Sequence, residues 1–69
     1  MLISDEERLD FLKDLDKSVT KGVEVTDWEA KFIESQLKFF SENPKLKVTF
    51  SPGQRDAVTK MYLKYGSQV

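Results

Sequence analysis

Five basic side chains in the second half of the chain are the residues whose type and spacing best suit ligand binding. Basic side chains bind phosphate groups, and exposed aromatic rings stack on the bases of single-stranded nucleic acid. Phe50, Tyr62 and Tyr65 lie among them in sequence. The pattern predicts that a contact surface for DNA or for a protein partner lies in this half, although such side chains also serve only to keep a small domain soluble. The five residues are Lys45, Lys47, Arg55, Lys60 and Lys64.

The segment 51–55, of sequence SPGQR, has two interpretations. The free amides at a helix start, a glycine that permits close approach and Arg55 together suit a bound phosphate. The same residues are also fully explained as a helix cap, because Ser51 is followed by a glutamine three positions later.

Most catalytic and metal-binding chemistry is excluded by composition. The chain has no cysteine and no histidine, so it has no disulfide, thiolate nucleophile, imidazole base or ordinary zinc site. Its three glycines are isolated, so no phosphate-binding loop is present. A calcium loop starting at Asp14 fails, because its sixth and twelfth positions are Val19 and Val25 instead of glycine and glutamate. We therefore expect a protein that is not an enzyme and that holds no metal or cofactor.

Charge and length constrain the class of protein. The 69 residues suit one domain, with a net charge of −1. Residues 1–34 hold ten acidic and five basic side chains, whereas residues 35–69 hold two acidic and six basic ones. Either the molecule is electrically bipolar, or helix packing mixes the two signs. No signal peptide or membrane span is evident, and we expect a cytoplasmic monomer that does not contact membranes.

The elements that position these residues are predicted from capping signals. Ser4, Thr26 and Ser51 are each followed three positions later by glutamate or glutamine, which is the pattern of a capping box. Gly22, Asn43 with the proline after it, and Gly66 mark the helix ends. The sequence therefore predicts an all-α domain, with three helices at about residues 5–20, 27–41 and 52–65 and an extended connector between the second and third.

Apolar spacing predicts the packing of these helices. The second helix has the broadest apolar face, so we expect it to be central. The connector alternates apolar and other residues, and we expect Leu46, Val48 and Phe50 to pack under the helices, with pairing to residues 23–25 as an alternative. Eight aromatic residues are many for so small a core, so one or two are expected on the surface. The predicted core residues are Leu12, Leu15, Trp28, Phe32, Ile33, Leu37, Val58, Met61 and Tyr62.

Three motifs resemble a known family. The segment 28–35 has the pattern W-E-x-x-F-I-x-S, residues 50–54 have F-S-x-x-Q, and the last helix is aromatic and ends in K-Y. In order and separation they resemble a small module of bacteriophage DNA-metabolism proteins, over residues 27–66. The resemblance implies structural roles for Trp28, Phe32, Gln54 and Tyr65, and it brings no catalytic or DNA-contacting residue.

The resemblance also implies a function. The expected role is a non-enzymatic accessory of phage DNA recombination, repair and replication, in contact with a UvsW-type helicase or another replication protein, in the host cytoplasm. One alternative is a module that binds single-stranded or forked DNA directly through the basic set. The other is an inhibitor or immunity-like helical protein that presents the acidic first helix to a basic partner, as the charge asymmetry permits.

Overall fold

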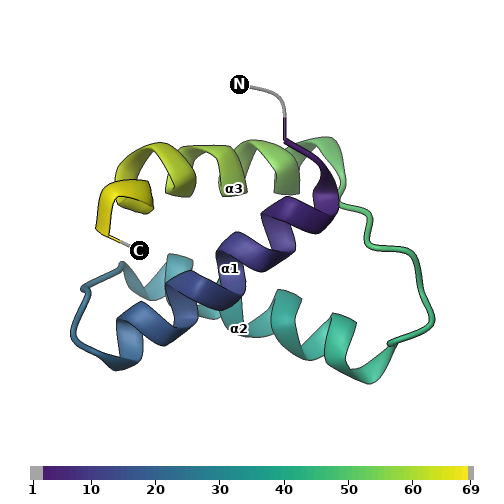
Figure 1. The fold of residues 1–69 in the computed structure, drawn as a ribbon, viewed down its shortest axis with the longest axis horizontal. Coiled ribbons are helices and arrows are strands. Elements are labelled where there is room, and N and C mark those ends of the chain that lie inside the picture. The colour runs from purple at the N-terminus through teal and green to yellow at the C-terminus, as the bar shows by residue number, and fades with distance from the viewer. Residues whose placement is uncertain (1–2, 69) are drawn as a thin grey trace.

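Three α-helices form the domain, in a computed structural model that describes residues 3–68 (Figure 1). They are α1 (Asp5–Thr20), α2 (Asp27–Glu42) and α3 (Pro52–Tyr65), and a 3-10 turn, η1 (Gly66–Gln68), follows α3. The described residues contain no strand. The predicted all-α class is confirmed, and the predicted helix bounds differ from the observed ones by one residue, at the end of α2.

Local hydrogen bonds explain where the helices start. Thr26 and Ser51 form complete capping boxes: each hydroxyl accepts from the N–H three residues later, and that residue's side chain accepts from the cap N–H. At α1 the box is half formed. The Ser4 hydroxyl accepts from the Glu7 N–H at 3.1 Å. The Glu7 carboxylate accepts from the Ser4 hydroxyl at 3.3 Å instead of from the backbone N–H of Ser4.

The helix ends follow from backbone conformation. Gly22 has a φ of 117°, a conformation that other residues rarely adopt. The Asn43 side chain donates to the carbonyl of Phe39 at 2.8 Å, and Pro44 cannot continue the helix. Gly66 stays right-handed, so the chain passes directly from α3 into η1.

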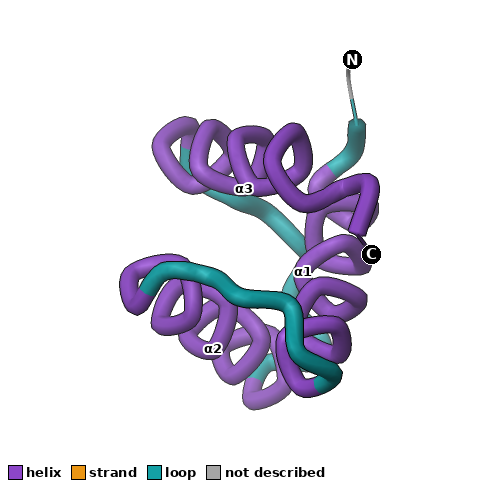
Figure 2. Tube along the Cα trace, turned by 90° about the vertical axis from the view of Figure 1, so that its left-hand side faces the viewer, coloured by secondary structure: helices purple, strands orange, loops and turns teal. Residues whose placement is uncertain are grey.

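α1 is the central helix. It packs against both α2 and α3, whereas α2 and α3 barely contact each other. Figure 2 shows them diverging on the side away from α1. The prediction that residues 27–41 form the central helix is wrong, because α1 buries side chains on two sides at once. Those side chains are Leu9, Phe11, Leu12 and Leu15.

The observed core agrees only in part with the predicted one. Leu12, Leu15, Ile33, Val58 and Met61 are buried as expected. Three further predicted core residues are only partly buried, namely Phe32, Leu37 and Tyr62.

Trp28 is the clear correction, because 61% of its surface is exposed. It lies in the first turn of α2, on the side where α2 and α3 separate and no helix covers it. The prediction that Trp28 is a core residue is therefore wrong, and any structural role that the resemblance implies for it is not burial in the core.

The connector between α2 and α3 supplies a core residue. Phe50 is 1% exposed, and its ring meets Phe40 edge to face at 5.5 Å. Val48 packs partly against the core, but Leu46 is 52% exposed, so the expectation that it packs inward is wrong. The chain turns at residues 44–45, where the Leu46 N–H donates to the carbonyl of Asn43. The connector is thus not extended throughout, and no described segment pairs with residues 23–25.

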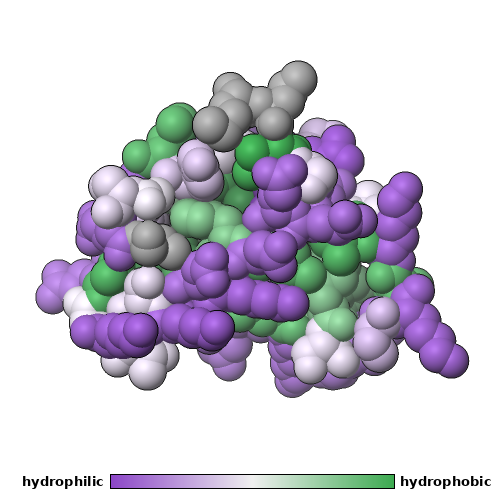
Figure 3. All heavy atoms as spheres, viewed as in Figure 1, coloured by the Kyte–Doolittle hydropathy of each residue, from purple (hydrophilic) through white to green (hydrophobic). Residues whose placement is uncertain are grey.

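The surface around α1 is largely hydrophilic. Figure 3 shows charged and polar side chains across the middle of this face, with apolar side chains both toward the connector and at the upper left, over α3. Within residues 3–68, every helix is too short or too polar to span a lipid bilayer.

Candidate functional site

Arg55 is one of the five predicted contact residues, and an acidic residue of α1 binds its side chain. Its Nε and terminal nitrogen donate to the two carboxylate oxygens of Asp5 at 3.1 and 2.9 Å. Asp5 also accepts from Arg8 at 2.9 Å and from the N–H of Phe50 at 3.3 Å. The side chain of Asp5 is 13% exposed, so this cluster joins the starts of α1 and α3 to the end of the connector.

This environment keeps Asp5 ionised. Hydrogen bonds from Arg55 are the main cause, and together with the Phe50 N–H and the charges of Arg55 and Arg8 they outweigh burial, so the pKa of Asp5 is lowered. Arg55 is therefore a clamp between helices in this structure, with its guanidinium already paired to a carboxylate.

Lys64 lies beside a second acidic residue. Its Nζ is 3.6 Å from a carboxylate oxygen of Glu29, and it sits 5.0 Å from the centre of the Tyr65 ring. The Tyr65 hydroxyl donates to Glu29 at 2.5 Å. Burial opposes ionisation of Glu29, but hydrogen bonds from Tyr65 and Thr26 and the charge of Lys64 prevail, so the pKa of Glu29 is lowered.

The remaining basic residues are on the surface. Lys60 pairs with Asp56 at 3.0 Å, and both side chains are largely exposed, so this pair adds little to stability. Lys45 and Lys47 are exposed on the connector and form no ion pair within the described part of the chain. The structure thus leaves these two lysines most available for a new contact.

These contacts bear on the two questions that the sequence left open. The Ser51 hydroxyl and N–H are both occupied by Gln54, and Arg55 is occupied by Asp5, which supports the capping interpretation of residues 51–55. The two ion pairs that join distant residues each link an acid of the first half to a base of the second. Helix packing therefore mixes the charges of the two halves, at least in part.

The exposed Trp28 forms one wall of an open pocket between α2 and α3. Its ring stacks on Phe32, with centres 5.3 Å apart and planes 17° apart. The pocket has a volume of about 320 Å³, and Gly53, Ala57 and Met61 of α3 form its opposite wall. We call this site the Trp28 surface. Its remaining lining residues are Glu29, Asp56 and Lys60.

Helical periodicity alone could not find this surface, because Trp28 falls on the apolar side of α2. The excess of aromatic residues over core volume was the available signal. A second large aromatic of α2, Phe39, is 49% exposed and lies farther along the same helix.

The described residues hold no group of three or more acidic, histidine or cysteine side chains that could bind a metal ion. The two acidic residues with shifted pKa values, Asp5 and Glu29, are both engaged in contacts between elements. The Trp28 surface presents an exposed indole, small facing residues and flanking charges.

Comparison of the chain with protein-family models, with curated proteins and with solved structures finds no match. The resemblance to a phage module accordingly rests on the three motifs. The geometry of the surface supplies the other basis for a functional proposal.

Proposed function

We propose that this protein is a non-enzymatic accessory of phage DNA recombination, repair and replication that acts by binding a protein partner, such as a UvsW-type helicase. The motifs of residues 27–66 support the setting in DNA metabolism. The mode of action is supported by one observation above the others: Trp28, the single tryptophan, is 61% exposed beside a pocket.

An exposed tryptophan in this position suits a protein contact. Tryptophan is enriched among the residues that contribute most to protein–protein affinity, because its large ring fills a partner's pocket at little cost in conformational entropy. The stack on Phe32 orders the indole before binding. Gly53 and Ala57, facing it from α3, leave room for a partner side chain.

The test is a titration of the full chain against a UvsW-type helicase by calorimetry. Trp28→Ala should weaken binding about tenfold or more. Leu63→Ala is the matched control, because Leu63 is apolar, 80% exposed and outside the Trp28 surface, and it should bind as the wild type does. Equal binding by Trp28→Ala, or no binding by the wild type, would overturn the proposal.

Direct DNA binding is the second candidate, and the exposure of Lys45 and Lys47 without ion-pair partners favours it. Labelled single-stranded, duplex and forked DNA would be titrated at low and moderate salt. A micromolar, salt-sensitive Kd that the Lys45→Glu, Lys47→Glu double variant abolishes would place this candidate first. Arg55 is left unchanged, because reversing its charge would also break its contact with Asp5.

A further inference from the structure

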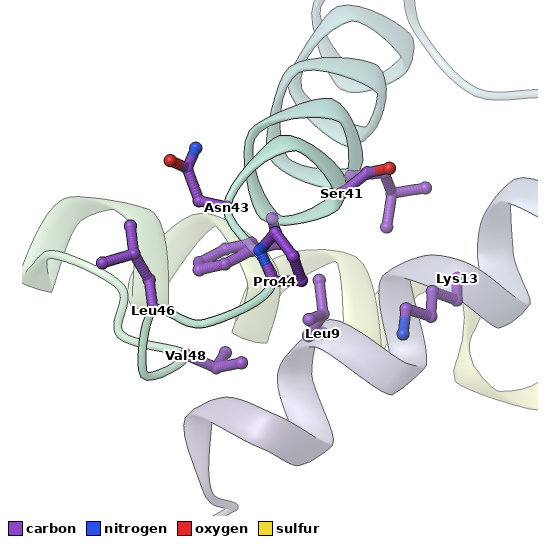
Figure 4. Close-up of a pocket in the computed structure, with 9 residues that line it drawn as sticks. Leu9, Lys13, Ser41, Asn43, Pro44, Leu46 and Val48 are labelled. Atoms are coloured by element: carbon purple, nitrogen blue, oxygen red, sulfur yellow. The ribbon is translucent and has the colours of Figure 1, made fainter.

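A second pocket lies between α1, the end of α2 and the connector (Figure 4). Its volume of about 540 Å³ is within the range of pockets that bind small ligands or side chains. It shares no lining residue with the Trp28 surface. Most of its wall is apolar, and the apolar side chains are Leu9, Leu37, Phe40, Pro44, Leu46 and Val48.

The one charged side chain that lines this pocket, Lys13, lies at one end of it. Figure 4 shows Lys13 and Ser41 on the same side, and Asn43, Leu46 and Val48 on the opposite side. No acidic residue lines the pocket. The amide of Asn43 is already bonded to a backbone carbonyl. The pocket therefore offers an ammonium group on one side and, across from it, the apolar side chains of Leu46 and Val48.

The ammonium group of Lys13 is available to a ligand. Lys13 is exposed and forms no ion pair among residues 3–68. Asp10 and Asp16 lie three residues to either side of it on α1, and neither pairs with it. An anion that reaches Lys13 thus displaces no internal partner.

We propose that this pocket binds the carboxyl terminus of a partner chain that ends in an apolar residue. The terminal side chain would pack against Leu46 and Val48, and the terminal carboxylate would pair with the Lys13 ammonium, as in other sites that capture chain termini. A chain end suits the pocket better than a free fatty acid, because Ser41, Pro44 and Leu46 are exposed at its rim. An open pocket covers one end of a ligand and leaves the remainder in solvent, whereas small molecules are usually enclosed.

The binding site goes beyond the proposed function and does not depend on the Trp28 surface. A fluorescein-labelled hexapeptide that ends in phenylalanine with a free carboxylate is the probe, and fluorescence polarisation with the full-length chain is the measurement. We expect saturable binding that weakens about tenfold when the peptide is amidated at its C-terminus. Replacing the terminal phenylalanine by serine should abolish it.

Variants of exposed residues test the two ends of the pocket without unfolding the domain. Lys13→Gln should weaken binding about tenfold, and Lys17→Gln, one turn along α1 and outside the pocket, should not. Leu46→Ser should weaken binding by removing an apolar side chain across from Lys13. Trp28→Ala should leave the peptide affinity unchanged, which separates this test from that of the proposed function.

Three results would overturn the proposal. They are equal binding of the free and amidated peptides, equal effects of Lys13→Gln and Lys17→Gln, and displacement of the peptide by octanoate at an equal concentration. The last result would assign the pocket to free aliphatic acids instead of chain ends. Far-UV circular dichroism of each variant establishes that the helices are retained.

Discussion

The two sides of α2 differ in what packs against them. α1 covers one side and buries Ile33 completely, and the connector adds Phe50 to the same core. The other side faces the space between α2 and α3, where Trp28 is 61% exposed and Phe39 is 49% exposed. Both sides are apolar, so hydrophobicity does not distinguish them. Burial depends on whether a second element lies opposite, which makes the uncovered side the place to look for an external partner.

Polar contacts also differ between the two junctions of α3, one with α1 and one with α2. Near the start of α1, Asp5 joins α1, α3 and the connector through four hydrogen bonds. Between α2 and α3, the side-chain hydrogen bonds and ion pairs seen in residues 3–68 all involve Glu29. The junction at Asp5 therefore has several polar contacts, whereas the junction between α2 and α3 has polar contacts only near one end of the two helices.

The largest expected effect tests the buried side. Phe50→Ala should destabilise the domain by about 3–5 kcal/mol, because the large ring leaves a cavity that the core cannot fill. That loss is comparable to the whole stability expected of so small a domain, so the variant should be largely unfolded by far-UV circular dichroism.

Phe39→Ala is the matched control for this experiment, since it removes the same side chain from a position that is 49% exposed. It should unfold in urea within about 1 kcal/mol of the wild type. Similar losses of stability in Phe50→Ala and Phe39→Ala would show that the two sides of α2 are equally packed, which would contradict the difference between them.

The helix bounds could be predicted from sequence because their causes are local. A hydroxyl, a glutamate or glutamine three residues later and the apolar spacing that follows are all contained within one or two turns. Thr26 and Ser51 form the complete boxes that their neighbours predict.

The packing and the candidate site could not be predicted in the same way. Fifty residues separate Arg55 from Asp5, and no local pattern indicates that they meet. Trp28 has the spacing of a core residue, and only the arrangement of α2 and α3 leaves it exposed. The order in which helices pack depends on all their faces together, which is why α1 and not α2 proved central.

Asp5→Asn should have the second-largest effect on stability, and it tests the hydrogen bonds of the Asp5 cluster. The amide cannot accept all the hydrogen bonds of the carboxylate and carries no charge, so we expect a loss of about 1–3 kcal/mol in the free energy of unfolding. Asp10→Asn, on the exposed part of α1, should change it little. Equal urea midpoints for the two variants would show that the Asp5 cluster does not stabilise the fold.

Acidification should weaken both junctions. The pKa values of Asp5 and Glu29 in the folded protein lie below their ordinary values of 3.8 and 4.5. A carboxyl with a lowered folded pKa stabilises the protein above its unfolded pKa, and this stability is lost as pH falls through the folded value. The thermal midpoint should therefore be nearly constant above about pH 5 and fall below it.

The double variant Asp5→Asn, Glu29→Gln should show a shallower fall than the wild type when calorimetric midpoints are compared at the same pH values. Tyr65→Phe should remove only a portion of the Glu29 contribution, since the Tyr65 hydroxyl is one of several groups that stabilise that carboxylate and makes no contact with Asp5. An unchanged slope in the double variant would assign the acid sensitivity to other carboxyl groups.

Trp28→Ala should have the smallest effect on stability, although it deletes the largest side chain of the domain. Most of the indole is in solvent, and what it loses on truncation is chiefly its stack on Phe32, so the expected cost is no more than about 1 kcal/mol. The urea midpoint should approach that of Leu63→Ala, whose side chain is 80% exposed. A loss near that of Phe50→Ala would mean that the space between α2 and α3 is closed and packed, and the Trp28 surface would not exist. A small loss of stability in Trp28→Ala would show that the indole contributes little to the fold. Binding to a partner then becomes the physical explanation for an exposed tryptophan at this position.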